Sequence, residues 1–323
     1  MIPGLIIILL LLTFILIKSA DIVVISLRRI SHSTHAAAFV LSALLLALAT
    51  SFPELFVGVT SALEGASSFS LGVILGSNIA NISLITGFAA LLAGKVIVHG
   101  EFMKKDVAIA LIAGILPMVL ALDKNLTRVD GLILIATWGA YATSFFKVRF
   151  LEIAERHKVE VYFHRLFRKI NHFDINKTKE YGRLFLGIIF LLASADMVVR
   201  VSKQLAITAN IPVFLIGLIL IAIGTSLPEL AFSLRSLEDN EPKMFFGNLL
   251  GSTIINSTLI VGMSVLINPL AALPLEDYAF SAIFFVIIYL TFWFFIKSKF
   301  RLDRWEAVTL ILLYIIFVIV EFV

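Results

Sequence analysis

The sequence contains no cysteine, and charged residues make up only 15% of its 323 positions. The absence of cysteine excludes disulfides and thiolate metal sites, and it leaves the redox compartment undetermined. Hydrophobic residues make up 60% of the chain, which is more than one soluble core of this length could hide. Apolar stretches of about 20 residues recur throughout, each long enough to cross about 30 Å of hydrocarbon. The chain is therefore predicted to lie mainly in lipid.

Histidine is absent from these apolar stretches. An intramembrane zinc protease needs histidine on a membrane span, and a serine protease needs a base beside its serine. We therefore expect that the chain is not an enzyme. A purely structural or receptor role is also disfavoured, because it has no use for the mirrored carboxylates described below. The histidines in or beside loops are His32, His35, His99, His157, His164 and His172.

The basic residues lie in short loops between apolar runs, although the formal net charge is +4. This distribution is typical of the positive-inside rule and argues against nucleic-acid binding. If the amino terminus is outside, the outer side keeps only Lys124, Arg128, Arg200 and Lys203. We therefore predict a multi-pass protein of the cell membrane with both termini outside and a cytoplasmic central loop. No obligatory protein partner is indicated.

The fold is predicted to be an all-α membrane protein with ten transmembrane helices arranged as two inverted five-helix repeats. The first apolar run is interpreted as a permanent helix, because no basic residue precedes it and no convincing cleavage site follows. The halves span residues 1–146 and 182–323, and a basic cytoplasmic connector, 147–181, is too short for a domain with its own core. The expected membrane spans are 2–26, 37–63, 69–93, 105–122, 129–146, 182–206, 211–236, 244–268, 278–296 and 305–322.

An internal repeat is the most informative feature of the sequence. A shift of 175 residues aligns the two halves without a gap across three spans. Five spans per half is an odd number, so the second half must enter the membrane in the opposite direction. Inverted repeats with matching polar, Gly/Pro-interrupted segments predict a binding site at the membrane midplane. The aligned identities include Ser19-Ala20-Asp21 with Ser194-Ala195-Asp196, Thr50-Ser51 with Thr225-Ser226, Pro53-Glu54-Leu55 with Pro228-Glu229-Leu230, Leu75-Gly76-Ser77 with Leu250-Gly251-Ser252, and Asn81 with Asn256.

Glu54 and Glu229 lie well inside the second and seventh predicted spans. A carboxylate at that depth costs several kcal/mol unless it is paired, protonated or wrapped around a cation. No Lys or Arg in either span is an obvious partner, because Arg235 is expected to reach the cytoplasmic surface. A pair of protonated carboxyls that bridge helices is the alternative, but it does not explain why the surroundings are duplicated.

Those surroundings are rich in oxygen. Pro53 and Pro228 should each kink or break a helix and free backbone carbonyls around 47–50 and 222–225. The third and eighth spans supply an opposing wall, and their Gly72, Gly76, Gly247 and Gly251 allow close helix approach. The predicted ligand oxygens belong to Thr50, Ser51, Ser77, Asn81, Thr225, Ser226, Ser252 and Asn256.

An all-oxygen site with two carboxylates suits Ca²⁺ better than Mg²⁺, and without His or Cys it suits Zn²⁺ and Cu²⁺ poorly. One Ca²⁺, Na⁺ ions or protons can each balance the two charges, which is a physical basis for exchange. We expect no bound cofactor beyond the transported ions. Asp21 and Asp196 also recur, and we assign them a structural or helix-terminal role.

Four motifs carry a resemblance to a known family. They are Ala-Thr-Ser-Phe-Pro-Glu (49–54), Gly-Ser-Asn-Ile-Ala-Asn (76–81), Gly-Thr-Ser-Leu-Pro-Glu (224–229) and Gly-Ser-Thr-Ile-Ile-Asn (251–256). These resemble the alpha-1 and alpha-2 repeats of the sodium/calcium exchanger family, within the calcium/cation antiporter superfamily. The short central loop is similar to that of prokaryotic members.

The resemblance implies an antiporter of Ca²⁺ and Na⁺. Glu54 and Glu229 would be the central Ca²⁺ ligands, shared with Na⁺, and the Thr50 and Thr225 region would complete the Ca²⁺ site. Spans one and six would slide across the other eight in alternating access. Residues implied to line the flanking Na⁺ sites are Ala47, Ser51, Ser77, Ala222, Ser226 and Ser252.

The sequence departs from the family pattern at three positions. Ala49 replaces a glycine, Val73 stands where many members have asparagine, and Asn256 occupies a position that is aspartate in some sodium-coupled members. The site thus has one carboxylate fewer. This leaves H⁺/Ca²⁺ exchange, or exchange that involves K⁺, open beside Na⁺/Ca²⁺ exchange on the same scaffold.

Overall fold

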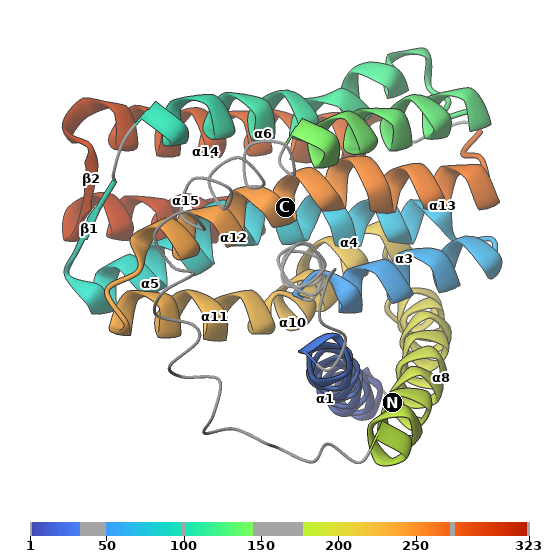
Figure 1. Ribbon diagram of the computed structural model, residues 1–323. Helices are drawn as coiled ribbons and strands as arrows, with labels where there is room; N and C mark the ends of the chain where they lie inside the picture. The colour runs from blue at the N-terminus through green and yellow to red at the C-terminus, as the bar shows by residue number, and fades with distance from the viewer. Residues whose placement is uncertain (1, 33–49, 99–100, 145–176, 272–274, 322–323) are drawn as a thin grey trace.

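The computed structural model describes residues 2–32, 50–98, 101–144, 177–271 and 275–321 (Figure 1). The described chain is mostly helical, and seven of its helices are long and apolar enough to cross a membrane. These results confirm a multi-pass membrane protein; the count of ten spans stays a prediction. The seven are Ile2–Val23, Ser67–Ala93, Asp106–Asp123, Lys179–Ala209, Val213–Glu238, Pro242–Ile267 and Tyr278–Lys299.

Of the other expected spans, 129–146 and 305–322 are also helical in their described parts, whereas 37–63 is described only from Thr50 onward. The elements are α1 (Ile2–His32), α3 (Phe52–Leu63), α4 (Ser67–Ala80), η1 (Asn81–Ile85), α5 (Thr86–Ala93), β1 (Lys95–Ile97), α6 (Glu101–Leu120), η2 (Ala121–Asp123), a helix at 128–144, α8 (Lys177–Ala209), α9 (Val213–Leu215), η3 (Ile216–Ile221), α10 (Ala222–Thr225), α11 (Leu227–Glu238), α12 (Pro242–Ile255), η4 (Asn256–Ile260), α13 (Val261–Ile267), α14 (Leu275–Lys299), β2 (Arg301–Asp303) and α15 (Arg304–Glu321).

The expected connector at 147–181 lies largely outside the described residues. Its described end is already helical, because α8 begins at Lys177 rather than at the expected residue 182. The helix continues into this polar stretch because Lys177, Lys179 and Glu180 are good helix formers and the last of these pairs with Arg183.

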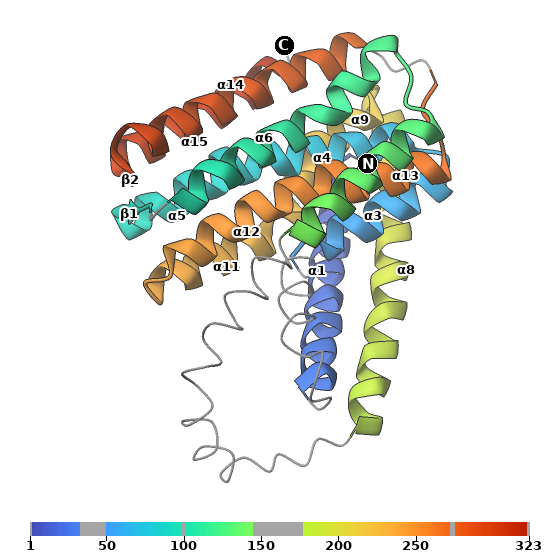
Figure 2. The ribbon, with the colours of Figure 1, turned by 45° about the horizontal axis from the view of Figure 1, so that its top comes forward.

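Two long helices form a unit of their own. α1 and α8 pack along each other, and both cross the remaining helices at a steep angle (Figures 1 and 2). The pair contacts α3, α9, η3 and α10. Glu54 lies in α3 and Glu229 follows closely after α10, so the α1/α8 pair lies beside the candidate site.

The described element bounds repeat between the halves. α3 and α11, α4 and α12, and η1 and η4 begin and end at positions 175 residues apart. The residue before each of the first two helices also adopts the same backbone conformation: Ser51 has φ −87° and ψ 8°, and Ser226 has φ −85° and ψ 2°. The sequence repeat therefore corresponds to a structural repeat over these segments.

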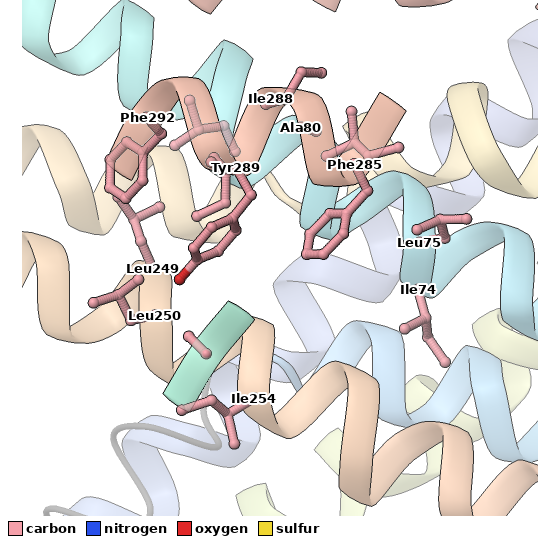
Figure 3. Close-up of a cluster of buried hydrophobic side chains, with 14 of the residues drawn as sticks. Ile74, Leu75, Ala80, Leu249, Leu250, Ile254, Phe285, Ile288, Tyr289 and Phe292 are labelled. Carbon is pink, nitrogen blue, oxygen red and sulfur yellow. The ribbon is translucent and has the colours of Figure 1, made fainter. Parts of the chain in front are cut away.

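A hydrophobic cluster packs α14 against α4 of the first half and α12 of the second half. Phe285, Tyr289 and Phe292 of α14 are completely buried against side chains of α12 and α4 (Figure 3). Large apolar side chains are instead more than half exposed on the outer helices, as expected for contact with lipid. Examples are Phe14, Ile112, Phe185, Phe294 and Ile319.

The structure adds two features to the predicted helical fold. The strands β1 and β2 pair antiparallel, with Val96 opposite Leu302 and both side chains buried. Three residues per strand are too few to give an alternating pattern in the sequence. Moreover, η1, η3 and η4 are π-helical, a form that is frequent at functional sites.

Candidate ion site

The site is positioned by two helices that each begin just before a proline. α10 ends at Thr225, and α11 begins after Ser226 with Pro228 in its first turn; α3 likewise begins after Ser51 with Pro53. Proline has no amide hydrogen, so Pro228 cannot donate to the carbonyl of Gly224 four residues earlier. The predicted break is confirmed in the second half, whereas in the first half the segment before Thr50 lies outside the described residues. Each of the two helices has a glutamate in its first turn.

Glu54 and Glu229 are completely buried, with 0% of each residue exposed. Ser77 links their surroundings, because its hydroxyl lies 3.4 Å from Glu54 Oε1 and 3.3 Å from Thr225 Oγ1, and neither glutamate forms an ion pair among the described residues. Two buried carboxylates without a basic partner repel each other, and their burial is unfavourable unless a cation or protons neutralise them. The geometry thus brings the two predicted acidic residues together.

The two halves exchange a symmetric pair of hydroxyl contacts around the glutamates. Thr50 Oγ1 lies 3.4 Å from Ser252 Oγ, and Ser77 Oγ lies 3.3 Å from Thr225 Oγ1. The repeat maps each pair onto the other, because Thr50 corresponds to Thr225 and Ser77 to Ser252. Ser77 also donates to Glu54 Oε1 at 3.4 Å. Four of the predicted ligands therefore join across the interface between the halves.

Several buried oxygens of the predicted site have no hydrogen-bond partner among the described residues. In this set, carboxylate, hydroxyl and amide oxygens occur together, the ligand types that hard cations prefer. Such groups are costly to bury without a partner, so their concentration at one place indicates a cation site. They are Glu54 Oε2, both carboxylate oxygens of Glu229, Ser51 Oγ, Ser226 Oγ, Asn81 Oδ1 and Asn256 Oδ1.

The structure describes one of the two predicted backbone ligands, Ala222, but not the other, Ala47. Ala47 lies outside the described residues. Ala222 is completely buried, and its carbonyl accepts hydrogen bonds from the Ser226 amide at 3.1 Å and from Thr225 Oγ1 at 3.4 Å. In the second half, the Ala222 carbonyl therefore keeps its helical hydrogen bond, and the donor that Pro228 cannot supply is the one for the Gly224 carbonyl.

The glycines of the third span permit the close approach that was predicted for them. A Cβ at Gly72 would collide with the carbonyl of Phe214, and one at Gly76 would collide with the carbonyl of Leu218. Gly247 and Gly251 have no such neighbour among the described residues; by the repeat, their partners would fall at 39 and 43, outside the described residues.

Asp21 and Asp196 lie apart from this cluster and are partly exposed. Asp21 pairs with Lys18 at 3.2 Å, and Asp196 accepts from Arg200 at 2.9 Å. Arg200 also reaches Glu64 at 2.7 Å, which links α8 to the end of α3. These contacts fit the structural role expected for both aspartates.

Three polar residues of this region were not identified as contributors from the sequence. Asn248 Oδ1 accepts from Thr50 Oγ1 at 3.1 Å. Asn78 Nδ2 donates to Ser257 Oγ at 2.7 Å, and Asn78 Oδ1 accepts from Asn256 Nδ2 at 3.2 Å. The repeat gave no signal for them, because Asn78 aligns with Thr253, Asn248 with Val73 and Ser257 with Ile82.

A multi-pass membrane protein with a buried, acidic, oxygen-lined site between two similar halves has the architecture of an ion transporter. The comparison with protein families gives the particular class. The family model for the sodium/calcium exchanger protein matches residues 4–147 and 179–323. The chain belongs to the sodium/calcium exchanger family; it is an antiporter-type membrane transporter and not an enzyme.

Curated relatives match along most of the chain. The sodium/calcium exchanger MaX1 of Methanosarcina acetivorans is 29% identical over 335 residues, which cover 95% of each protein. The uncharacterized membrane protein MJ0091 of Methanocaldococcus jannaschii is 29% identical and covers 92% of this chain and 91% of its own. The inner membrane protein YrbG of Escherichia coli is 28% identical, with coverage of 86% and 85%.

Solved structures of the sodium–calcium exchanger NCX_Mj share the fold. The form soaked with 10 mM Na⁺ and 10 mM Sr²⁺ has a TM-score of 0.61 and 27% identity, and 97% of each chain is covered. The form soaked with 2.5 mM Na⁺ and 0.1 mM Ca²⁺ also has a TM-score of 0.61 and 27% identity, with 95% of each chain covered. The chain therefore has the fold of a short, prokaryotic-type member of this family.

Proposed function

We propose that this protein exchanges Ca²⁺ for Na⁺ across the cell membrane by alternating access to a midplane site. The pairing of Glu54 with Glu229 carries the proposal. Both carboxylates are completely buried, they belong to corresponding positions of the two halves, and neither has a basic partner among the described residues. The unpartnered oxygens around them supply the remaining ligands of a flexible site, which suits Ca²⁺.

The ligand set of the proposal includes both glutamates and the oxygens contributed by their neighbours in each half. Thr50, Ser77, Thr225 and Ser252 form the cross-half contacts and would tighten around the ion. In the empty state the two negative charges repel each other in a medium of low dielectric constant, so the site reorients only when it is loaded. The other proposed ligands are Ser51, Ser226, Asn81, Asn256 and the backbone at Ala47 and Ala222.

The arrangement in the membrane belongs to the same proposal. Ten helices in two inverted halves, residues 1–146 and 182–323, would place both termini outside and the basic connector at 147–181 in the cytoplasm. The α1/α8 pair packs as a unit across the other helices and borders the site through α3 and α10, which supports its role as the part that moves.

An alternative proposal differs only in the ion that is exchanged for Ca²⁺. H⁺/Ca²⁺ exchange, or exchange that also involves K⁺, would use the same paired carboxylates, and Asn256 in place of an aspartate lowers the charge available to bind Na⁺. Na⁺, H⁺ and K⁺ can each neutralise the two carboxylates, so only a transport measurement can identify the coupling ion.

Calcium uptake into liposomes that contain the purified protein tests the proposal. An outward sodium gradient should drive ⁴⁵Ca²⁺ uptake, and collapse of any pH gradient with a protonophore should leave that uptake unchanged. Replacement of internal Na⁺ by K⁺ or choline distinguishes a K⁺ contribution. Calcium movement that is indifferent to sodium but follows the pH gradient would refute Na⁺ coupling and support the alternative.

A further inference from the structure

Asn78 is buried on α4 next to Ser77, with only 2% of the residue exposed, yet it has no counterpart in the repeat. Its amide contacts two consecutive residues of the other half. The nitrogen donates to Ser257 Oγ at 2.7 Å, and the oxygen accepts from Asn256 Nδ2 at 3.2 Å. Both contacted residues lie at the start of η4, which packs against α3 and α4.

This contact fixes which end of the Asn256 amide points away from Asn78. Because the nitrogen of Asn256 is used by Asn78, its oxygen is the free end; that oxygen is buried and has no partner among the described residues. A cation is attracted by an amide oxygen and repelled by an amide N–H. The observed orientation is therefore the one that offers Asn256 to a cation.

The corresponding position in the other half lacks this constraint. Asn81 corresponds to Asn256, and both its amide nitrogen and its oxygen are buried without a partner among the described residues. Thr253, which corresponds to Asn78, donates to the Leu249 carbonyl of its own helix at 3.0 Å instead. The two asparagines of the site thus differ in hydrogen bonding, although the repeat makes them equivalent in sequence.

We propose that Asn78 is a positioning residue that holds the Asn256 amide with its oxygen toward the transported cation. The proposal rests on the proposed function of the site. Ser257 completes the arrangement, because its hydroxyl accepts from Asn78 Nδ2 and thereby turns the Asn78 oxygen toward Asn256. Without that acceptor, Asn78 would present its nitrogen, and the Asn256 amide would reverse. Hydrogen bonds behind a metal ligand commonly control its orientation in this way.

The test substitutes Asn78→Leu, which keeps the approximate volume and removes both hydrogen bonds. We expect the half-saturating Ca²⁺ concentration for exchange in liposomes to rise roughly tenfold, the lower end of the effect seen for residues that orient metal ligands. The maximal rate should fall much less. The Ca²⁺-induced rise in Tm of the purified protein should shrink in parallel, because ligand-linked stabilisation depends on affinity.

Thr253→Val is the matched control. It removes a buried hydroxyl at the corresponding position, where the hydrogen bond stays within one helix, so it should leave the half-saturating concentration within twofold of the wild-type value. Ser257→Ala is the second variant and should shift Ca²⁺ dependence in the same direction as Asn78→Leu. If Asn78→Leu does not fold, Ser257→Ala alone decides the question.

A double-mutant cycle with Asn256→Asp separates positioning from general support of the fold. A carboxylate presents oxygen in either orientation, so Asn78→Leu should have a much smaller effect on Ca²⁺ dependence in the Asp background. Equal effects in both backgrounds, or an unchanged half-saturating concentration with only a lower Tm, would overturn the proposal. A wild-type protein without Ca²⁺ exchange would instead refute the proposed function itself.

Discussion

At the scale of single residues, the chemistry of the site depends on buried charge without a countercharge. Glu54 and Glu229 have no ion-pair partner in the described part of the chain, whereas partly exposed acids such as Glu64 and Asp196 do. Such an arrangement is unfavourable unless a cation or protons neutralise it. The two glutamates therefore connect stability to ion occupancy.

Glu54→Gln and Glu229→Gln should each abolish Ca²⁺ exchange while the protein still folds. Each substitution removes one of the two charges that balance Ca²⁺ and relieves the repulsion between the carboxylates. In ion-free buffer, Tm should stay the same or rise, and the Ca²⁺-induced rise in Tm should disappear. Liposome flux and thermal unfolding in detergent measure the two effects.

Glu238→Gln provides the control on the same helix as Glu229. Its side chain is 70% exposed, and its ion pair with Arg235 is long, at 3.9 Å. Loss of this exposed pair should change neither flux nor the response to Ca²⁺. Retention of full Ca²⁺ exchange by Glu54→Gln would contradict a role for that carboxylate in binding the ion.

At the scale of elements, the approach of α4 to the segment 213–222 brings the two halves together. Gly72 and Gly76 of α4 face backbone carbonyls of Phe214 and Leu218, and Gly217 faces the carbonyl of Phe69 in return. Because glycine occupies both surfaces, the helices meet backbone to backbone, and Ser77 reaches Thr225 of the other half.

Gly76→Ala should therefore be strongly destabilising, by about 1–3 kcal/mol as for overpacked cores. Its Cβ would collide with the Leu218 carbonyl and the Cβ of Ala222, and relief of that clash would separate Ser77 from Thr225. Tm should fall and the half-saturating Ca²⁺ concentration should rise. Gly139→Ala is the matched control, because nothing lies within 4 Å of its added Cβ and alanine favours helix. An unchanged Tm for Gly76→Ala would contradict the packing.

Local chemistry decides which elements the sequence predicts. The breaks at Ser51 and Ser226 follow from the covalent structure of the prolines that come next, and Glu54 and Glu229 stand out because charge at membrane depth is costly. The π-helices at Asn81–Ile85 and Asn256–Ile260 have no such local signature. They depend on how neighbouring helices pack. The contacts of Asn78 were missed for a related reason: they join segments far apart in the chain and are not repeated.

At the scale of the whole molecule, the described loops fall into two groups at opposite ends of the helices. Leu126 and Leu270 exchange backbone hydrogen bonds of 2.8 and 3.0 Å, which joins the loops after α6 and α13. Asn268 also contacts Ser67 at the start of α4. At the other end, β1 pairs with β2, and Lys95 and Asn240 border the same cavity. The basic residues Lys243, Lys297, Lys299 and Arg301 lie in or beside the second group, which the charge distribution predicts to be the cytoplasmic side.

Single cysteines should reveal which group faces the cytoplasm, because the natural chain has no thiol of its own. Arg128→Cys and Lys243→Cys place a thiol at exposed positions in the first and second group, respectively. By the positive-inside rule, a membrane-impermeant maleimide should label Arg128→Cys on intact cells and Lys243→Cys only after the cells are permeabilised. The cysteine-free parent shows the background, and a permeant maleimide shows that both thiols are reactive. Labelling of Lys243→Cys alone on intact cells would reverse the orientation, and with it the side from which each half of the transport cycle loads its ion.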